Sequence, residues 1–178
     1  MIGGWFWRRF AEPQVQAYLL HGEGEQIIDE VRHHWMAYWR ALLELVVATV
    51  MLYLFLISPE DISWLPFWLF LGFGLHAAWL ALSEHVDRFV ITNMRVFRVR
   101  GVFNTKRATM PMTRILDITV EKPLLGRFFD YGHFVFESAA QEQGLKKIRY
   151  VGSPDERDLT IQRVVQRSGL RRFAGGPR

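Results

Sequence analysis

Two long apolar runs separated by four residues constrain the fold of this chain more than any other feature. Ala37 to Ile57 has one charge in its last 17 residues, Glu44, and Ile62 to Leu82 has none. A helix of about 20 residues crosses the roughly 30 Å hydrocarbon core of a bilayer, and both runs have that length. Helices that are apolar on all sides could otherwise be buried only inside a large soluble protein. The sequence therefore predicts two transmembrane helices.

The segment between the runs determines their arrangement. Ser58 to Asp61 (SPED) is long enough only for a tight turn, and Pro59 disfavours helical geometry in the residue before it. We therefore expect an antiparallel helical hairpin. SPED has no Lys or Arg, whereas the other ends of the runs are flanked by Arg32, Arg40, Arg88 and Arg95. The positive-inside rule then predicts a multi-pass protein of the inner or plasma membrane with both termini in the cytoplasm.

From residue 83 onward the chain is basic and its hydrophobic period becomes two. This part has 18 Lys/Arg against 10 Asp/Glu. Alternating β-branched and aromatic residues predict strands at Asp87–Thr92, Arg95–Arg100, Lys106–Pro111, Ile115–Glu121, His133–Ser138 and Leu145–Val151. A capping serine, a proline and early acids predict a helix from Ser153 to Gly169, with Leu159, Val164 and Val165 toward one side. Antiparallel strands closed by one helix make a small α+β domain.

These patterns divide the chain into four parts. Residues 1–36 are expected to form a cytoplasmic N-terminal segment, whose aromatic and basic start at Trp5 to Phe10 suits either the headgroup region or a disordered segment. Residues 37–82 form the hairpin and residues 83–168 the cytoplasmic domain. Residues 169–178 are expected to be a basic, flexible tail.

The domain contains motifs that resemble those of a known family. A Thr-Asn-x-Arg turn at Thr92 opens a strand that ends at Gly101, and the next motifs contain Pro111, Arg114, Ile115 and Asp117, then Gly126, Arg127, Tyr131 and Gly132. In this order after a hairpin, they resemble the bacterial pleckstrin-homology (PH) domain, or membrane-flanked domain, family, over roughly residues 18 to 166. The resemblance implies a PH-like sandwich or barrel of two orthogonal antiparallel sheets capped by a C-terminal helix. It implies no particular biochemical activity.

Basic residues gather on several of the predicted strands. Arg98 and Arg100 share a strand face, because side chains two apart point the same way, and Arg95 points to the other face. A candidate patch for an anionic ligand comprises Arg95, Arg98, Arg100, Lys106, Arg107, Lys146, Lys147 and Arg149. It suits lipid headgroups or an acidic partner, and the alternative is a solvated positive face that only enforces topology. Nucleic acid is not an expected partner, because the basic strands lack interleaved exposed aromatic residues.

Two polar residues interrupt the apolar runs at matching depth. Glu44 and His76 each lie roughly 8 Å from the predicted cytoplasmic ends of their helices, at 1.5 Å per residue. In an antiparallel hairpin they could form a hydrogen bond as an intramembrane polar pair. The alternative is that each side chain reaches separately toward the interface. A proton relay would need further acids, and the runs contain none.

No motif points to catalysis, a cofactor or a metal. The chain has no cysteine, which excludes thiolate chemistry and Cys-based zinc sites. It also lacks a nucleophile elbow, a glycine-rich phosphate loop and a His-Glu-x-x-His motif. Potential ligands gather at the predicted membrane boundary, but the adjacent histidines do not have i, i+4 spacing: His33, His34, Glu84, His85 and Asp87.

These observations favour a membrane-anchored, non-enzymatic interaction module. Its cytoplasmic domain is expected to bind a protein partner, or to act as an accessory or scaffold subunit of a membrane complex. The hairpin is expected to pack against another membrane protein or a second copy of the chain. The alternative is a module for envelope maintenance that binds anionic-lipid headgroups.

Overall fold

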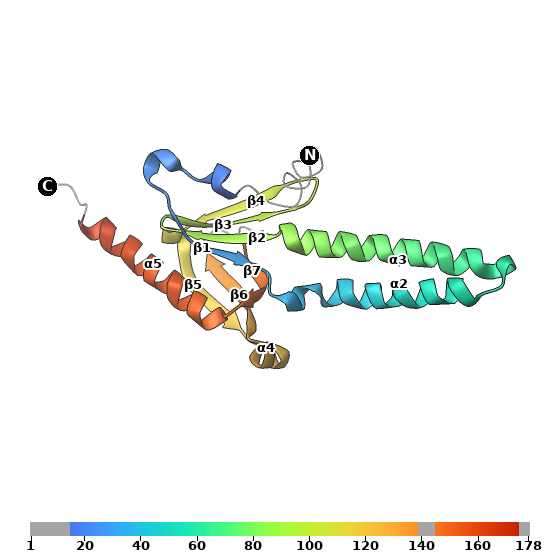
Figure 1. Cartoon of the computed structure of the whole chain (residues 1–178). Coiled ribbons are helices and arrows are strands. Elements are labelled where there is room, and N and C mark those ends of the chain that lie inside the picture. The colour runs from blue at the N-terminus through green and yellow to red at the C-terminus, as the bar shows by residue number, and fades with distance from the viewer. Residues whose placement is uncertain (1–14, 139–144, 175–178) are drawn as a thin grey trace. The chain divides into compact units, whose positions relative to one another are not determined.

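A computed structural model describes residues 15–138 and 145–174 of the chain (Figure 1). It contains two compact units. One is the hairpin unit, Trp35–His85, and the other combines the described residues before Trp35 with those from Val86 onward. The second unit, called the domain from here on, is therefore built from two chain segments, with the hairpin inserted between them. The aromatic start at residues 5–10 lies outside the described residues.

The hairpin consists of α2 (Trp39–Ile57), preceded by the short helix η3 (Trp35–Tyr38), and α3 (Glu60–Val86). Ser58 ends α2 with extended backbone, and its N–H and hydroxyl both donate to the Leu54 carbonyl, at 3.0 and 2.7 Å. The acids Glu60 and Asp61 open α3, where negative charge suits the helix dipole. The predicted hairpin is confirmed, and α3 begins two residues before the second apolar run and ends four residues after it.

Both helices are long and apolar enough to cross a membrane. Only 11% of the most apolar window of the first span and 6% of that of the second is buried inside the molecule. The buried hydrophobic residues of this unit are the small ones, Ala37, Ala41, Ala48 and Ala77. Small side chains allow membrane helices to approach closely. Most of the large apolar side chains point outward and are not covered by a core within this unit.

The domain contains two antiparallel sheets. The first has the order β1-β2-β3-β4, with β1 (Ile27–Arg32), β2 (Arg88–Thr92), β3 (Arg95–Arg100) and β4 (Lys106–Pro111). The second has the order β5-β6-β7, with β5 (Ile115–Glu121), β6 (Tyr131–Ser138) and β7 (Lys147–Gly152). The short helix η4 (Met112–Arg114) joins the sheets, α4 (Leu124–Phe129) joins β5 to β6, and α5 (Pro154–Ala174) follows β7. This confirms the predicted fold of two sheets capped by a C-terminal helix.

The main difference from the prediction is β1. Ile27–Arg32 was predicted to lie in a separate N-terminal segment, but this strand pairs antiparallel with β2 and forms one edge of the first sheet. Ile27–Arg32 therefore belongs to the domain. The hairpin separates two neighbouring strands that are joined by backbone hydrogen bonds.

The first sheet is covered on both faces. Its inner face contributes Phe89, Ile91 and Val96 to the main core, together with Phe134 and Ile148 of the second sheet. Its outer face is covered by the short helix η1 (Val15–Tyr18) and Leu19, which pack on Val90, Phe97 and Val99. Cover on both faces explains why all five residues of β2 are buried.

The helix α5 closes the core with a different set of side chains from the one predicted. Ile161 and Val164 are buried in the core and Val165 packs against them, whereas Leu159 is exposed. Two residues along a helix turn the side chain by roughly 200°, so Leu159 and Ile161 cannot face the same side. The helix also continues past Gly169 to Ala174, so the predicted flexible tail begins in helical structure.

Candidate functional site

The chain connects the domain to the hairpin at two neighbouring points. His34 is the last domain residue before η3, and Asp87 is the only residue between α3 and β2. Arg32, at the end of β1, pairs with Arg88, at the start of β2. The two connections therefore leave the domain side by side, and the connection between α3 and β2 is a single residue long. We call this part of the domain the junction end.

The strand register places basic residues at the junction end. Val99 pairs with Arg88, and the next residue of β3, Arg100, pairs with Lys106 at the start of β4. Because β3 runs back toward the junction end, Arg100 and Lys106 lie one residue beyond the level of Arg88. A pocket of about 230 Å³ opens here, lined by Arg98, Arg100, Lys106, Arg107 and Ala108.

Strand β7 crosses the same end of the domain. Val151 forms a bridge with His33, and the Lys147 carbonyl accepts a hydrogen bond of 3.3 Å from Arg98. The basic residues of this segment, Lys146, Lys147 and Arg149, therefore also belong to the junction end. Of the eight cations in the predicted patch, seven gather here and Arg95 does not.

Arg98 has a structural role at this end. Its guanidinium donates to both carboxylate oxygens of Asp87, at 2.8 and 2.6 Å. Only 12% of the Arg98 side chain and 10% of the Asp87 side chain are exposed. Together with its bond to Lys147, this ion pair joins the two sheets and balances the charge of Arg98. We therefore do not count Arg98 among the cations available to a ligand.

The remaining cations differ in the contacts that they make with other side chains. Arg107 lies on the outer face, with its guanidinium 4.4 Å from the centre of the Tyr18 ring, and Lys147 pairs with Glu121. Arg100 and Lys106 are exposed and form no ion pair with any described residue, and the same holds for Lys146 and Arg149. At the junction end, no acidic side chain among the described residues balances the positive charge of these four side chains.

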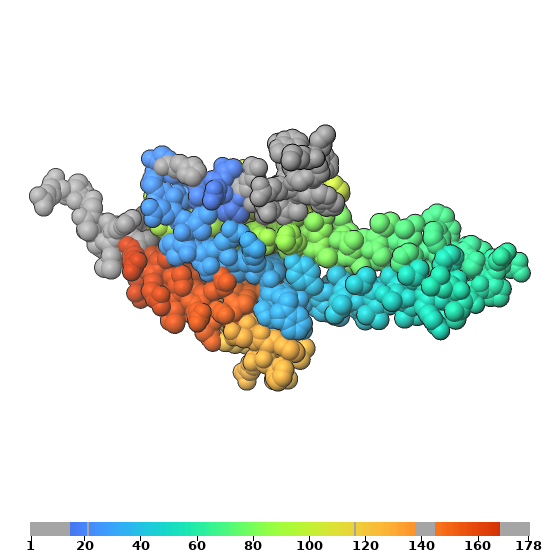
Figure 2. All heavy atoms as spheres, in the orientation of Figure 1, coloured from blue at the N-terminus to red at the C-terminus, as the bar shows by residue number. Residues whose placement is uncertain are grey.

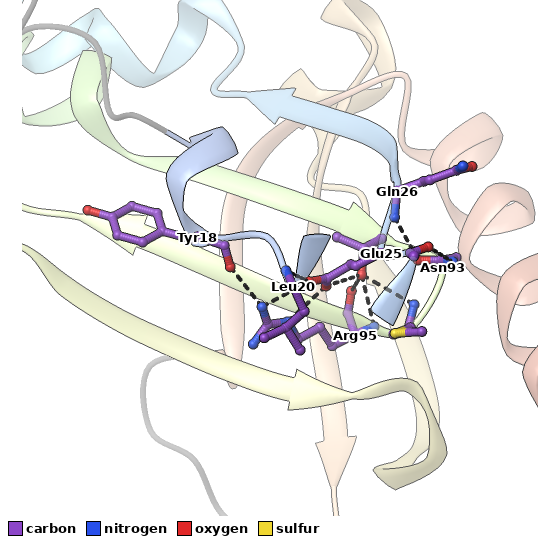
Figure 3. A network of polar contacts seen from close by, with 9 residues as sticks. Tyr18, Leu20, Glu25, Gln26, Asn93 and Arg95 are labelled. Atoms are coloured by element: carbon purple, nitrogen blue, oxygen red, sulfur yellow. Dashed lines mark hydrogen bonds and ion pairs between the residues drawn. The ribbon is translucent and has the colours of Figure 1, made fainter. Parts of the chain in front are cut away.

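Arg95 lies in a buried polar network at the opposite end of the first sheet (Figure 3). The Glu25 carboxylate accepts hydrogen bonds from Arg95 at 2.8 and 3.0 Å, from the Leu20 N–H at 2.8 Å and from the Thr92 hydroxyl at 2.8 Å. Arg95 also donates to the Tyr18 carbonyl at 2.8 Å. The Glu25 side chain is 0% exposed. Arg95 therefore fastens the N-terminal segment and is not a free anion-binding group.

The same network explains the Thr-Asn-x-Arg motif. Asn93 accepts a hydrogen bond from the Gln26 N–H at 2.9 Å and donates to the Gly24 carbonyl at 3.1 Å. Thr92 Oγ1 accepts hydrogen bonds from the backbone N–H groups of Met94 and Arg95. The motif shapes the turn between β2 and β3 and attaches it to the residues just before β1. Its role is structural.

The network lowers the pKa of the Glu25 carboxyl. Burial by itself raises this pKa, but the hydrogen bonds from Arg95, the Leu20 N–H and Thr92, with the positive charge of Arg95, outweigh burial. The pKa therefore lies below the ordinary value of 4.5. Glu25 is ionised at neutral pH, and the pair contributes stability that depends on pH.

In the hairpin, Glu44 and His76 lie in contact. Glu44 Oε2 and His76 Nδ1 are 2.6 Å apart, which is hydrogen-bonding distance between α2 and α3. The matching depth predicted from the sequence is thus accompanied by direct contact in the structure. This pair is a polar link between two otherwise apolar helices, and its energetic coupling is a prediction that we state below.

The histidines and acids near the boundary are not gathered around one point. His33 Nε2 lies 3.9 Å from Asp87 Oδ2, while the His34 ring stacks on Tyr131 with centroids 5.5 Å apart. Burial lowers the pKa of His34 and outweighs the opposing charge of Asp130, so this ring is neutral at neutral pH. Within residues 15–138 and 145–174, no three His, Asp or Glu side chains are grouped so that they could hold a metal ion.

We expect Glu44→Leu and His76→Leu each to lower the thermal stability of the full-length protein in detergent. The double variant should lose less than the sum of the two losses, because each single change already removes the shared hydrogen bond. Interhelical hydrogen bonds in membranes average about 0.6 kcal/mol, so the coupling should be of that order. Strictly additive losses in this double-mutant cycle would show two independent side chains.

We expect Glu25→Gln to lower the free energy of unfolding of the domain at pH 7 by about 3 kcal/mol, because it removes the buried carboxylate and leaves the half-buried Arg95 without a counter-charge. The exposed neighbour Glu23 provides the matched control, and Glu23→Gln should have little effect.

The loss caused by Glu25→Gln should also depend on pH. Because the folded pKa is depressed, the wild-type pair is fully stabilising above pH 4.5 and loses this contribution as the pH falls through the folded pKa. Denaturant unfolding of both proteins between neutral and acidic pH should therefore give a difference that shrinks in acid. A difference that stays constant over this range would contradict the role assigned to the ionised Glu25.

Comparison with known proteins places this architecture in a family. A family model described as Bacterial PH domain matches residues 40–168, which include most of the hairpin, both sheets except β1, and the first part of α5. A search of curated proteins gave no match, and a search of solved structures gave none. The matched range is well over half of the chain. On this match, the chain belongs to the bacterial PH domain family.

Proposed function

We propose that this protein is a membrane-anchored, non-enzymatic module whose PH domain binds the headgroups of anionic lipids at the cytoplasmic surface. The observation that supports this role best is the position of the cations that form no ion pair with any described residue. Arg100 and Lys106 line a pocket at the end of the sheet from which the chain passes into the apolar helices. A ligand on the membrane surface would be close to that pocket.

The tether strengthens weak contacts of this kind. Each Lys or Arg near an anionic leaflet contributes about 1 kcal/mol, and the effect falls off within a Debye length. Because only Asp87 separates β2 from α3, the junction end stays within reach of the membrane that holds α3, so binding to lipid becomes an intramolecular event with a high effective concentration. Four exposed cations without acidic partners among the described residues therefore suffice for a contact that depends on lipid charge: Arg100, Lys106, Lys146 and Arg149.

The orientation in this proposal follows from charge. The segment Ser58 to Asp61, which comprises the turn after α2 and the first residues of α3, contains only acidic charges, at Glu60 and Asp61, whereas the domain is basic. The positive-inside rule then assigns the domain to the cytoplasm, where anionic lipids give the leaflet its negative surface potential. Bacterial PH domains are generally non-catalytic modules, and we assign no reaction to this one.

The sequence analysis expected a protein partner first and lipid second. We reverse this order because the strand register puts the free cations beside the two connections to the hairpin. A protein partner would not require the charge to be concentrated there. The test below separates the two roles.

We expect phosphatidylglycerol, added to the full-length protein in a neutral detergent, to raise Tm more than phosphatidylcholine does. A ligand that binds only the folded state stabilises it by RT ln(1 + [L]/Kd), which is about 2.7 kcal/mol when the lipid concentration is 100 times Kd. The difference between the two lipids should disappear in Arg100→Gln + Lys106→Gln. It should also disappear at about 1 M salt, where the Debye length is about 3 Å.

The control variant is Arg163→Gln + Arg167→Gln, which removes the same charge from exposed positions on α5. It should keep the wild-type response to phosphatidylglycerol. Equal stabilisation of the wild type by both lipids would contradict the proposal and leave the protein-binding role. Equal loss in both double variants would show that net charge matters and the pocket does not.

A further inference from the structure

The short helix α4 exposes three large apolar side chains. Leu124 is 83% exposed, Leu125 57% and Phe128 81%. The opposite side of the helix packs closely on the start of β6. At Gly126 the approach is so close that an added Cβ atom would lie only 2.3 Å from the Tyr131 carbonyl oxygen. Figure 2 shows α4, in gold, projecting from the surface of the domain. Exposed apolar clusters of this kind mark contact sites for membranes or proteins.

The surrounding chain holds α4 in place. Pro123 precedes its first turn, and Asp130 ends it in the left-handed conformation (φ 55°), with the Asp130 N–H donating to the Gly126 carbonyl. The Asp130 carbonyl in turn accepts a hydrogen bond from the Ser153 N–H. The apolar side chains are therefore presented by a fixed turn of helix.

This helix belongs to the junction end. Tyr131, which follows α4 after a single residue, stacks on the ring of His34. The His34 N–H donates to the Tyr150 carbonyl at 2.7 Å, and His34 is the last domain residue before the hairpin. Leu124, Leu125 and Phe128 are thus exposed beside one of the two points at which the chain passes into the apolar helices.

The charges around α4 also favour a lipid surface. Arg127 is exposed on the same helix, and the nearby carboxylates of Glu121 and Asp155 are paired with Lys147 and Lys122. The carboxylate of Asp130, at the end of α4, accepts a hydrogen bond from the Ser153 hydroxyl. Apolar side chains accompanied by cations are typical of segments that lie in the interface of an anionic bilayer. If α4 faced water, the three apolar side chains would remain in contact with solvent and gain no favourable burial.

From this arrangement we infer that α4 inserts Leu124, Leu125 and Phe128 into the interfacial region of the bilayer that holds the hairpin. The inference rests on the membrane attachment in the proposed function, but it concerns apolar insertion and not headgroup binding. With the two chain connections, α4 supplies a third attachment point, and three points fix the tilt of a domain on a surface. The pocket with Arg100 and Lys106 is then held at a constant height above the headgroups.

The absence of cysteine from the chain makes a direct test practical. Single variants Leu124→Cys and Phe128→Cys of the full-length protein are spin-labelled and reconstituted into phosphatidylcholine vesicles, with and without phosphatidylglycerol. The accessibility of each label is measured to oxygen, which concentrates in lipid, and to a nickel chelate, which stays in water. Val46→Cys, exposed on α2, is the control for lipid, and Ile28→Cys, exposed on β1 far from the junction end, is the control for water.

We expect the oxygen-to-nickel ratio at positions 124 and 128 to exceed that at Ile28→Cys and to remain below that at Val46→Cys, in both kinds of vesicle. A ratio equal to that at Ile28→Cys shows α4 in water and overturns the inference. Protection from both reagents shows a protein surface, a partner or a second copy, and also overturns it. Since insertion is expected without phosphatidylglycerol, this result is independent of headgroup binding, and the Val46→Cys label reports separately on the membrane span.

Discussion

The pairing of β1 with β2 across the inserted hairpin is the constraint on which the rest of the structure depends. These strands are neighbours in the sheet although more than 50 residues separate them in the chain. Their pairing brings the two ends of the hairpin together, closes the first sheet and defines the junction end. The Glu25–Arg95 pair stabilises this arrangement at the far end of the sheet, where it joins the segment before β1 to the turn after β2. A change that weakened β1 would therefore affect the attachment of the domain and its fold together.

Most of the fold could be predicted because its signals are local. Apolar length predicted the two long helices of the hairpin, and period-two alternation predicted β2 to β7 with each end within two residues of the observed one. The strand β1 was missed since IIDEVR is short, carries three charges and lies before the hairpin, so its partner strand is remote in sequence. Glu25, which lies two residues before Ile27, was an available signal for a buried pair. Leu159 was predicted on the buried side of α5 because the prediction did not include Ile161, whose burial determines which face of the helix packs on the core.

The sequence predicted which cations belong to the candidate site, but not which of them are paired with acidic side chains. Alternation along β3 showed that Arg98 and Arg100 share a face, and the structure agrees with this. It could not show that Asp87 would neutralise Arg98 or that Arg100 would stay unpaired, because both depend on how the two sheets meet. The contact between Glu44 and His76 was easier to predict from the sequence, because an antiparallel hairpin with a tight turn determines which residues of its two helices lie at the same depth. The exposed face of α4 could not be inferred from LLGRFF, which has the composition of a core segment.

The cations that form no ion pair with any described residue and the exposed apolar helix lie at one end of the domain, and this end is also where the chain passes into the two long apolar helices. We propose that this end contacts anionic headgroups through the β3–β4 pocket. Hydrogen–deuterium exchange of the full-length protein in nanodiscs tests it most directly. Backbone amides at residues 100–107 should exchange more slowly in phosphatidylglycerol than in phosphatidylcholine, while those at residues 24–26 and 92–95, at the far end of the sheet, should not change. Equal exchange at residues 100–107 in the two lipids would contradict the account.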